Sequence, residues 1–260
     1  MELSKLHWID THTHLFDEEF LEDIETVIER SILLGVDKMM LPNIDLETIE
    51  LTKALALKYP ENCFAMMGIH PCSVSEHYKL HLDQIEKELF SDFKYYGVGE
   101  IGIDLHWDKT TENIQNRVFI KQCEWAAELN LPVSIHTRNA THQTIQLVKK
   151  MDKKPSGVFH CFSGSIEEAK EIIDLGFYLG IGGVVTYKNS TLGDIVKEIG
   201  LQHLVLETDS PYLPPTPHRG KRNESSYIPL IGEKLSFVFE TTIENIAETT
   251  TKNARAVFGI

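Results

Sequence analysis

The sequence lacks several features that mark secreted or membrane-bound proteins. No cysteines are spaced as C-x-x-C, and the four present form no pattern typical of a disulfide framework. No apolar run approaches the ~20 residues that a membrane-spanning helix needs. The first residues have no basic start followed by an apolar stretch, so we expect no signal peptide. These absences predict a cytoplasmic protein with free thiols.

Basic residues are also scarce, with 25 Lys and Arg against 39 Asp and Glu, and the net charge is −14. Phosphate neutralisation dominates non-specific affinity for nucleic acids, so this balance argues against a tight nucleic-acid binder. It leaves open an enzyme that holds phosphate locally through metal ions and a few arginines. Twelve histidines are many for an acidic chain, and their positions need an explanation.

Short apolar runs alternate with longer amphipathic stretches along the chain. Apolar residues recur at three- and four-residue spacing, as at Phe20, Ile24 and Val27. We predict strands at Leu6–Ile9, Asp37–Leu41, Phe64–Ile69, Tyr95–Gly99, Pro132–Ile135, Gly157–Phe159, Phe177–Ile181 and His203–Leu206. We predict helices at 17–34, 45–58, 79–90, 111–129, 141–152, 165–175 and 190–199, with one or two more in the tail 226–258.

Eight strand–helix units in series, without a long linker, favour a parallel sheet. At 260 residues, eight units fit a closed barrel better than an open doubly wound sheet. We therefore predict an α/β fold, a TIM (β/α)8 barrel, with residues 1–260 as one domain. The proline-rich segment 208–226 is predicted to be its longest loop.

The first predicted strand leads into an H-x-H pair, His12 and His14. Side chains alternate between the faces of a strand, so Asp10, His12 and His14 share one face if the strand continues that far. Two imidazoles on one face can bind a single metal ion. Alone the pair is weak evidence, since histidines at this spacing also occur by chance.

Four other strands lead into residues that can ligate a metal: Glu100, His136, His160 and Asp209. The carboxyl ends of barrel strands converge on one face, where barrel active sites lie. Each residue alone has an ordinary structural explanation, such as a hydrogen-bonded histidine or a helix-capping carboxylate. Together they would be costly to desolvate at a dry barrel mouth without a cation. The combination favours a metal site.

Six ligands suit two divalent ions ~3.5–4 Å apart that share a carboxylate. Glu100 is the predicted bridge, being the only carboxylate among the central strands. The other ligands divide between the ions, with His12, His14 and Asp209 on one and His136 and His160 on the other. Imidazole and carboxylate together suit Zn, Mn, Fe or Co, and Mg less naturally. Such ions would generate a hydroxide, and Asp209 could accept the proton.

Several residues near the expected barrel mouth suit a phosphate or a base. The planar fork of Arg138 matches a phosphodiester, although an ion pair with a loop carboxylate is an equal alternative. A basic run comprises His218, Arg219, Lys221 and Arg222. It could steer an anion locally, although such runs are usually solvated surface. Three aromatic residues could stack on bases, although core packing is the commoner role: Trp107, Phe162 and Tyr212.

Six ordered motifs resemble those of the TatD family of metal-dependent deoxyribonucleases, within the amidohydrolase superfamily. They are Asp10–His14, Gly68–Pro71, Gly99–Asp104, Ile135–Arg138, His160–Gly164 and Glu207–Leu213. The resemblance covers residues 9–222 and continues nearly to the end of the chain. Two positions depart from it, without touching a candidate ligand. Asn139 stands where an acidic residue is common, and Ser225 stands where the family usually has Pro.

The resemblance implies a TIM barrel and a divalent-metal phosphodiesterase, usually a Mg-dependent 3′–5′ exonuclease on DNA. It implies metal ligation by the six residues named above, and contact of His70 with substrate phosphate. We place His70, Arg138 and Arg219 in the substrate site, and Glu100 and Asp209 at the chemistry. We expect single-stranded or frayed DNA, because a closed barrel mouth cannot easily admit a duplex. We expect two divalent ions (Mg in assays; Zn, Mn or Co compatible), no membrane partner and a monomer.

Two other functions stay open. An amide, ester or lactone hydrolase, including one that deacylates aminoacyl-tRNA, would use the same site, because fold does not decide substrate. Glu100 at the bridge position counts against the carbamylated-lysine type of amidohydrolase. A binding or scaffold protein with a relict site would hold metal without turnover, and the complete ligand set counts against it.

Overall fold

The computed structural model describes residues 6–107 and 109–260. Eight strands lie in this part of the chain: β1 Trp8–Asp10, β2 Val36–Pro42, β3 Cys63–Met66, β4 Val98–Asp104, β5 Val133–Arg138, β6 Gly157–Phe159, β7 Tyr178–Ile181 and β8 Leu204–Leu206. They pair in parallel, in the order β1-β2-β3 and β4-β5-β6-β7-β8. Every predicted strand is present, β6 with the predicted ends and the other seven with shifted ends.

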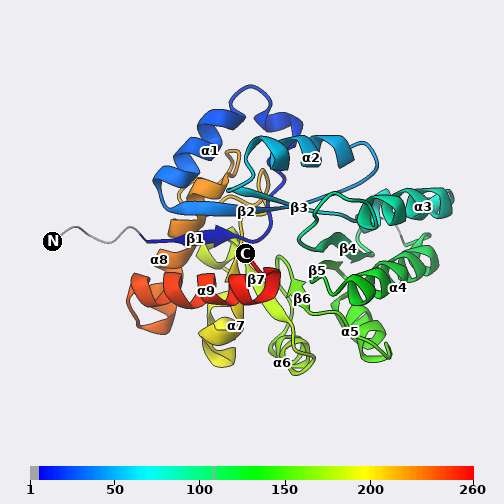
Figure 1. The fold of residues 1–260 in the computed structure, drawn as a ribbon. Helices are drawn as coiled ribbons and strands as arrows, with labels where there is room; N and C mark the ends of the chain where they lie inside the picture. Colours follow the sequence, from blue (N-terminus) through cyan, green and yellow to red (C-terminus); the bar gives the residue numbers. More distant parts are fainter. Residues whose placement is uncertain (1–5, 108) are drawn as a thin grey trace.

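Backbone hydrogen bonds join the two sheets into a closed ring. Between β8 and β1, the Thr11 amide donates to the Leu206 carbonyl at 3.0 Å. Between β3 and β4, the Tyr96 amide donates to the Ala65 carbonyl at 2.9 Å. Figure 1 shows the helices arranged around the strands. The predicted barrel is therefore confirmed.

The outer helices of the described residues are α1 Ile24–Leu33, α2 Ile49–Lys58, α3 Tyr78–Leu89, α4 Glu112–Leu129, α5 Thr141–Lys149, α6 Ile166–Asp174, α7 Leu192–Ile199, α8 Ile228–Phe239 and α9 Ile243–Phe258. The tail thus holds two helices, as predicted. The helix predicted over 17–34 is instead divided, with a short 3₁₀ helix at Glu18–Phe20 before α1. No described helix is long and apolar enough to cross a membrane.

Strand alternation divides the apolar residues into two buried clusters. Met39 and Leu41 belong to the larger cluster, whereas Met40 between them belongs to a smaller one. The smaller cluster contains Ile9, Met40, Phe64, Met66, Val158, Val205, Ala254 and Phe258. Since alternate residues of barrel strands point inward, this cluster fills the barrel interior, together with the last turns of α9. Polar side chains lie near the carboxyl ends of the strands.

Three strand ends differ from the prediction in ways that affect the site. β1 stops at Asp10, so the strand alternation expected to place Asp10, His12 and His14 on one face does not apply. The Asp10 carboxylate instead accepts hydrogen bonds from the amide and hydroxyl of Thr208 at 2.9 and 2.6 Å. β4 and β5 run further than predicted, which places Glu100 and His136 inside strands rather than after them.

Candidate metal centre

The carboxylate of Glu100 lies at the middle of a cluster of imidazoles. Its Oε2 atom lies 3.2 Å from His12 Nε2 and 3.4 Å from His14 Nε2. Its Oε1 atom lies 2.8 Å from His160 Nε2 and 3.0 Å from His136 Nδ1. The two oxygens of one carboxylate thus face two different pairs of imidazoles.

Asp209 lies on the Oε2 side of the cluster. Its Oδ1 atom is 3.6 Å from His14 Nε2 and 3.8 Å from His12 Nε2. It follows β8 at a φ of 54°, a left-handed conformation that Asp adopts more readily than most residues. Its amide donates to the His12 carbonyl at 2.9 Å, which joins the two loops. The six residues chosen from the sequence therefore lie together.

His70 adds a seventh group, on the Oε1 side. Its Nε2 atom lies 3.3 Å from Glu100 Oε1, and its ring meets that of His136 edge to face. The Cys72 amide donates to His70 Nδ1 at 3.1 Å, so only Nε2 is directed at the cluster. His70 thus borders the centre, at a position open to either an ion or a substrate.

The ring nitrogens that face Glu100 are better suited to binding cations than to contacting the carboxylate directly. Ser134 and Asp104 bind the outer nitrogens of His12 and His136, at 2.9 and 3.1 Å. When those outer nitrogens donate, the inner nitrogens carry lone pairs, and these face the oxygens of Glu100. Lone pairs directed at a carboxylate repel it unless a cation lies between them. The outer contacts are those that orient histidine ligands around metal ions.

The electrostatics of the cluster also favour cations. Burial lowers the pKa of His12 to about 3, so this ring is neutral. Burial opposes the ionisation of Glu100, but the imidazoles, His70 first, lower its pKa well below the ordinary value. The pKa of His14 rises to about 9, because Asp209 and Glu100 outweigh the opposing effect of burial. Anionic carboxylates and neutral imidazoles are the forms that ligate metal, so Glu100 and His12 already have those forms, whereas a bound ion would replace the proton that His14 holds without it.

Comparison with known proteins places this arrangement in a family. The family model described as TatD related DNase matches residues 9–259. The chain belongs to the TatD family. It is 40% identical over 253 residues to the uncharacterized metal-dependent hydrolase YabD of Bacillus subtilis, covering 96% of this chain and 98% of that one. This TatD-family chain is a metal-dependent hydrolase, and the resemblance read from its motifs is confirmed.

Two further relatives make the likeness more specific. The chain is 31% identical over 258 residues to the 3′-5′ ssDNA/RNA exonuclease TatD of Escherichia fergusonii, covering 96% of this chain and 98% of that one. The crystal structure of YjjV, a TatD homologue from Escherichia coli K12, matches with a TM-score of 0.92 and 30% identity. The match covers 97% of this chain and 98% of that one.

Three residues behind the candidate ligands of this TatD-family chain were not identified from the sequence: Ser134, Asp104 and Glu207. Ser134 and Asp104 lie on the same strands as His136 and Glu100, at even spacing and hence on the same face. This spacing in the sequence could have indicated that Ser134 and Asp104 face the candidate ligands. Glu207 is fully buried, and its Oε1 atom lies 3.7 Å from the outer nitrogen of His160. It also accepts a hydrogen bond from the Cys161 amide.

The arginines predicted near the barrel mouth differ in their surroundings. Arg138 and Arg219 are exposed, and each guanidinium lies over an aromatic ring, of Trp107 at 5.2 Å and of Tyr187 at 4.0 Å. Arg138 forms no ion pair within the described part of the chain. Arg222 instead forms a two-fold ion pair with Asp23, so this member of the basic run is structural.

The three aromatic residues considered for base stacking also differ in exposure. Phe162 is buried, whereas Trp107 and Tyr212 expose 71% and 49% of their surface. The loop that carries Tyr212 is held by Asn223, whose amide group donates to the carbonyls of Thr208 and Tyr212 at 2.7 and 2.6 Å. Two aromatic side chains thus remain available on loops that leave the candidate centre.

Proposed function

We propose that this TatD-family hydrolase removes nucleotides from the 3′ end of single-stranded DNA with the help of two divalent ions. The observation that carries the proposal is the division of the Glu100 oxygens between two sets of imidazoles. A relative of similar length is named a 3′-5′ ssDNA/RNA exonuclease, which supports a nucleic-acid substrate.

In this proposal the carboxylate of Glu100 would help to hold both ions. His12, His14 and Asp209 complete the ligands on the Oε2 side, and His136 and His160 those on the Oε1 side. When bound, two ions supply an acidified water and polarise a phosphoryl oxygen. Mg, Mn, Co and Zn are all compatible with this ligand set.

Side chains at the barrel mouth would transfer the proton and bind the phosphates. The Asp209 side chain is 15% exposed against 3% for Glu100, so Asp209 is the carboxylate that can accept a proton from water. The side chain of His70, at 15% exposure, can donate from Nε2 to a phosphate oxygen. Arg138 and Arg219 offer planar donor groups to the neighbouring phosphates.

The test is nucleotide release from a 3′-labelled single-stranded oligonucleotide with Mg, Mn, Co or Zn. Glu100→Ala and Asp209→Ala should each reduce release to the level of chelated wild-type enzyme. Glu248→Ala, an exposed carboxylate on α9, serves as the matched control and should retain full activity. Full activity in Glu100→Ala or Asp209→Ala would refute the proposal, and a 5′-labelled substrate reports the polarity.

A panel of amides and esters, including an aminoacyl-tRNA, tests the acyl-transfer alternative in the same experiment. Metal-dependent turnover of one of these, without nucleotide release, would replace the phosphodiesterase proposal. Metal binding without turnover of any substrate would leave the scaffold function.

A further inference from the structure

Trp107 is the most exposed aromatic residue among the loops around the candidate metal centre. The indole exposes 71% of its surface, three residues after the end of β4. The other two tryptophans, Trp8 and Trp125, are 1% and 2% exposed. A single exposed ring is ordinary, and what distinguishes this one is its place on the loop that follows the strand of Glu100.

Arg138 packs against this ring from the neighbouring strand. Asp104 and Arg138 are register partners at the ends of β4 and β5, so Trp107 and Arg138 leave the barrel side by side. The guanidinium carbon lies 5.2 Å from the ring centroid, and the His106 ring meets the indole edge to face. With both neighbours in place, most of the indole still faces solvent.

The carboxylate of Asp104 ties this pair to the metal centre. Its Oδ1 atom accepts hydrogen bonds from the amides of His106 and Trp107, at 2.8 and 3.3 Å. Its Oδ2 atom binds Nε2 of His136 at 3.1 Å. One carboxylate thus orients a candidate ligand and holds the start of the loop that carries the indole. The start of the loop that carries the indole is therefore fixed relative to His136.

We propose that Trp107 and Arg138 form a subsite for one unpaired nucleotide next to the scissile phosphate. This inference rests on the proposed function, and it explains how the proposed active site would select single-stranded DNA. The indole stacks on the base, and the guanidinium binds the adjoining phosphate. A base inside a duplex is stacked between its neighbours on both faces, so such a platform favours a base that has left the duplex. It tolerates every base, since each has a π face.

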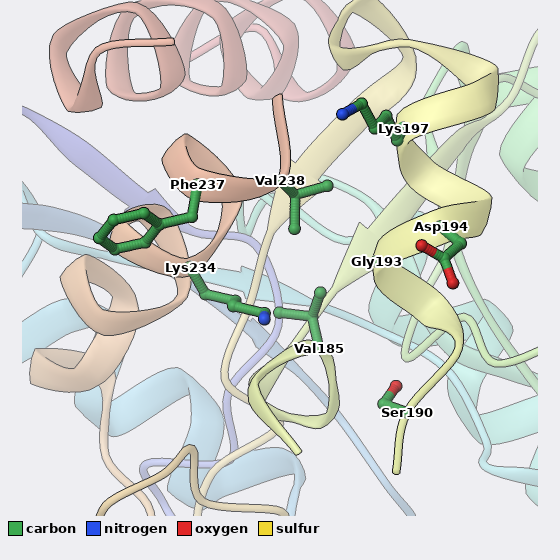
Figure 2. Close-up of a pocket in the computed structure, with 8 residues that line it drawn as sticks. All are labelled: Val185, Ser190, Gly193, Asp194, Lys197, Lys234, Phe237 and Val238. Atoms are coloured by element: carbon green, nitrogen blue, oxygen red, sulfur yellow. The ribbon is translucent and has the colours of Figure 1, made fainter. Parts of the chain in front are cut away.

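A second exposed aromatic residue, far from these ligands, provides a matched control. Phe237 is 73% exposed and lies on α8, beside the groove between α7 and α8 that Figure 2 shows. Two lysines line this groove, and Lys197 is paired with Glu240. No candidate metal ligand lines it. Phe237→Ala therefore removes a similarly exposed ring without affecting the subsite.

The experiment combines variants with abasic substrates. Wild-type enzyme, Trp107→Ala, Trp107→Phe and Phe237→Ala are assayed on single-stranded oligonucleotides that are intact or abasic at one of the three 3′-terminal positions. Loss of one stacked base costs about tenfold in affinity. Trp107→Ala should therefore raise KM about tenfold on the intact strand, and Trp107→Phe and Phe237→Ala should stay near wild type. At one abasic position, wild type and Trp107→Ala should become equal.

A second measurement follows the indole itself. Because Trp8 and Trp125 are buried, acrylamide-accessible emission comes from Trp107. A phosphorothioate oligothymidylate that resists cleavage should quench this emission and protect it from acrylamide. The same emission should be absent in Trp107→Phe.

The outcomes separate the subsite from the proposed function. If the wild type releases nucleotides and Trp107→Ala matches it on the intact strand, the subsite is refuted and the nuclease stands. An equal loss in Trp107→Ala on the intact strand and on every abasic strand also refutes base stacking. If the wild type cleaves no oligonucleotide, the proposed function fails and the subsite fails with it.

Discussion

The Nδ1 atom of His12, in the loop that follows β1, lies 2.9 Å from the hydroxyl oxygen of Ser134 on β5. Both groups are buried, so no water competes for the contact. When the ring donates from Nδ1 to the hydroxyl, Nε2 is left with the lone pair that faces Glu100. In that arrangement the hydroxyl accepts the bond and holds His12 in the tautomer that can ligate an ion.

We predict that Ser134→Ala weakens divalent metal binding by about tenfold, the lower end of the loss usual for a residue that orients a ligand. Titration calorimetry of the chelated protein with Co or Zn measures this. Ser31→Ala is the matched control, because that buried hydroxyl donates to the Val27 carbonyl within α1, away from the site. Unchanged metal affinity in Ser134→Ala would remove the serine from the site.

We expect Glu207 to orient the ring of His160, as Ser134 orients that of His12. Burial raises the pKa of Glu207, and among the described residues neither its Oε2 atom nor the outer nitrogen of His160 has a hydrogen-bond partner. Ligation at Nε2 would direct the Nδ1 proton of His160 at the Glu207 carboxylate, whose Oε1 atom lies 3.7 Å away. We predict that Glu207→Ala weakens metal binding by about ten- to a hundredfold and that Glu207→Gln retains more of it, since an amide oxygen still accepts. Equal affinity in Glu207→Ala and wild type would contradict this.

The grouping of the candidate ligands could be predicted from the sequence, because it follows from strand order. Parallel strands bring their carboxyl ends to one face, so chain order and residue type alone unite His136, His160 and Asp209. The orienting groups could not be read in the same way. Ser134 and Asp104 matter only through the ring nitrogen that each one binds, and that depends on side-chain direction. Neither residue type is distinctive in a sequence.

The strand boundaries show a second limit. The apolar pattern places β4 over 95–99, yet the strand extends to Asp104, because backbone pairing with β5 continues past Glu100. β1 ends at Asp10, one residue beyond the predicted Leu6–Ile9 but short of His14, and the Asp10 carboxylate there binds Thr208. Long-range hydrogen bonds decide both ends, and no local pattern reports them.

Arg30 and Glu224 connect α1 to the segment that follows the β8 loop. Their side chains form two hydrogen bonds, of 2.7 and 2.6 Å, and Glu224 is nearly buried. Burial opposes ionisation, but Arg30 lowers the pKa of Glu224 below its ordinary value. A lowered carboxyl pKa stabilises the fold above the unfolded value of about 4.3, and this stabilisation is lost as pH falls through the folded pKa.

We therefore predict that Glu224→Gln lowers the free energy of unfolding by about 1–2 kcal/mol at pH 7, less than a fully buried pair because Arg30 is 39% exposed. The difference from wild type should shrink as pH falls below about 4. Urea unfolding across this range measures it. Glu25→Gln, which breaks an exposed pair with Lys58, is the control and should change little. A constant difference at all pH values would refute the ion-pair explanation.

The division of Glu100 between two sides of the cluster predicts how metal is lost. Elemental analysis should find two ions per wild-type chain, and one each in His14→Ala and His160→Ala, because each variant damages one side. Glu100→Ala should retain neither, since both sides share its carboxylate. His142→Ala, an exposed histidine on α5, is the control with two ions. Chelation should lower Tm in the wild type, because one ion at a hundred times its Kd adds about 2.7 kcal/mol to stability. Loss of both ions in His14→Ala and in His160→Ala would instead indicate one shared ion, and the two-ion proposal would fail.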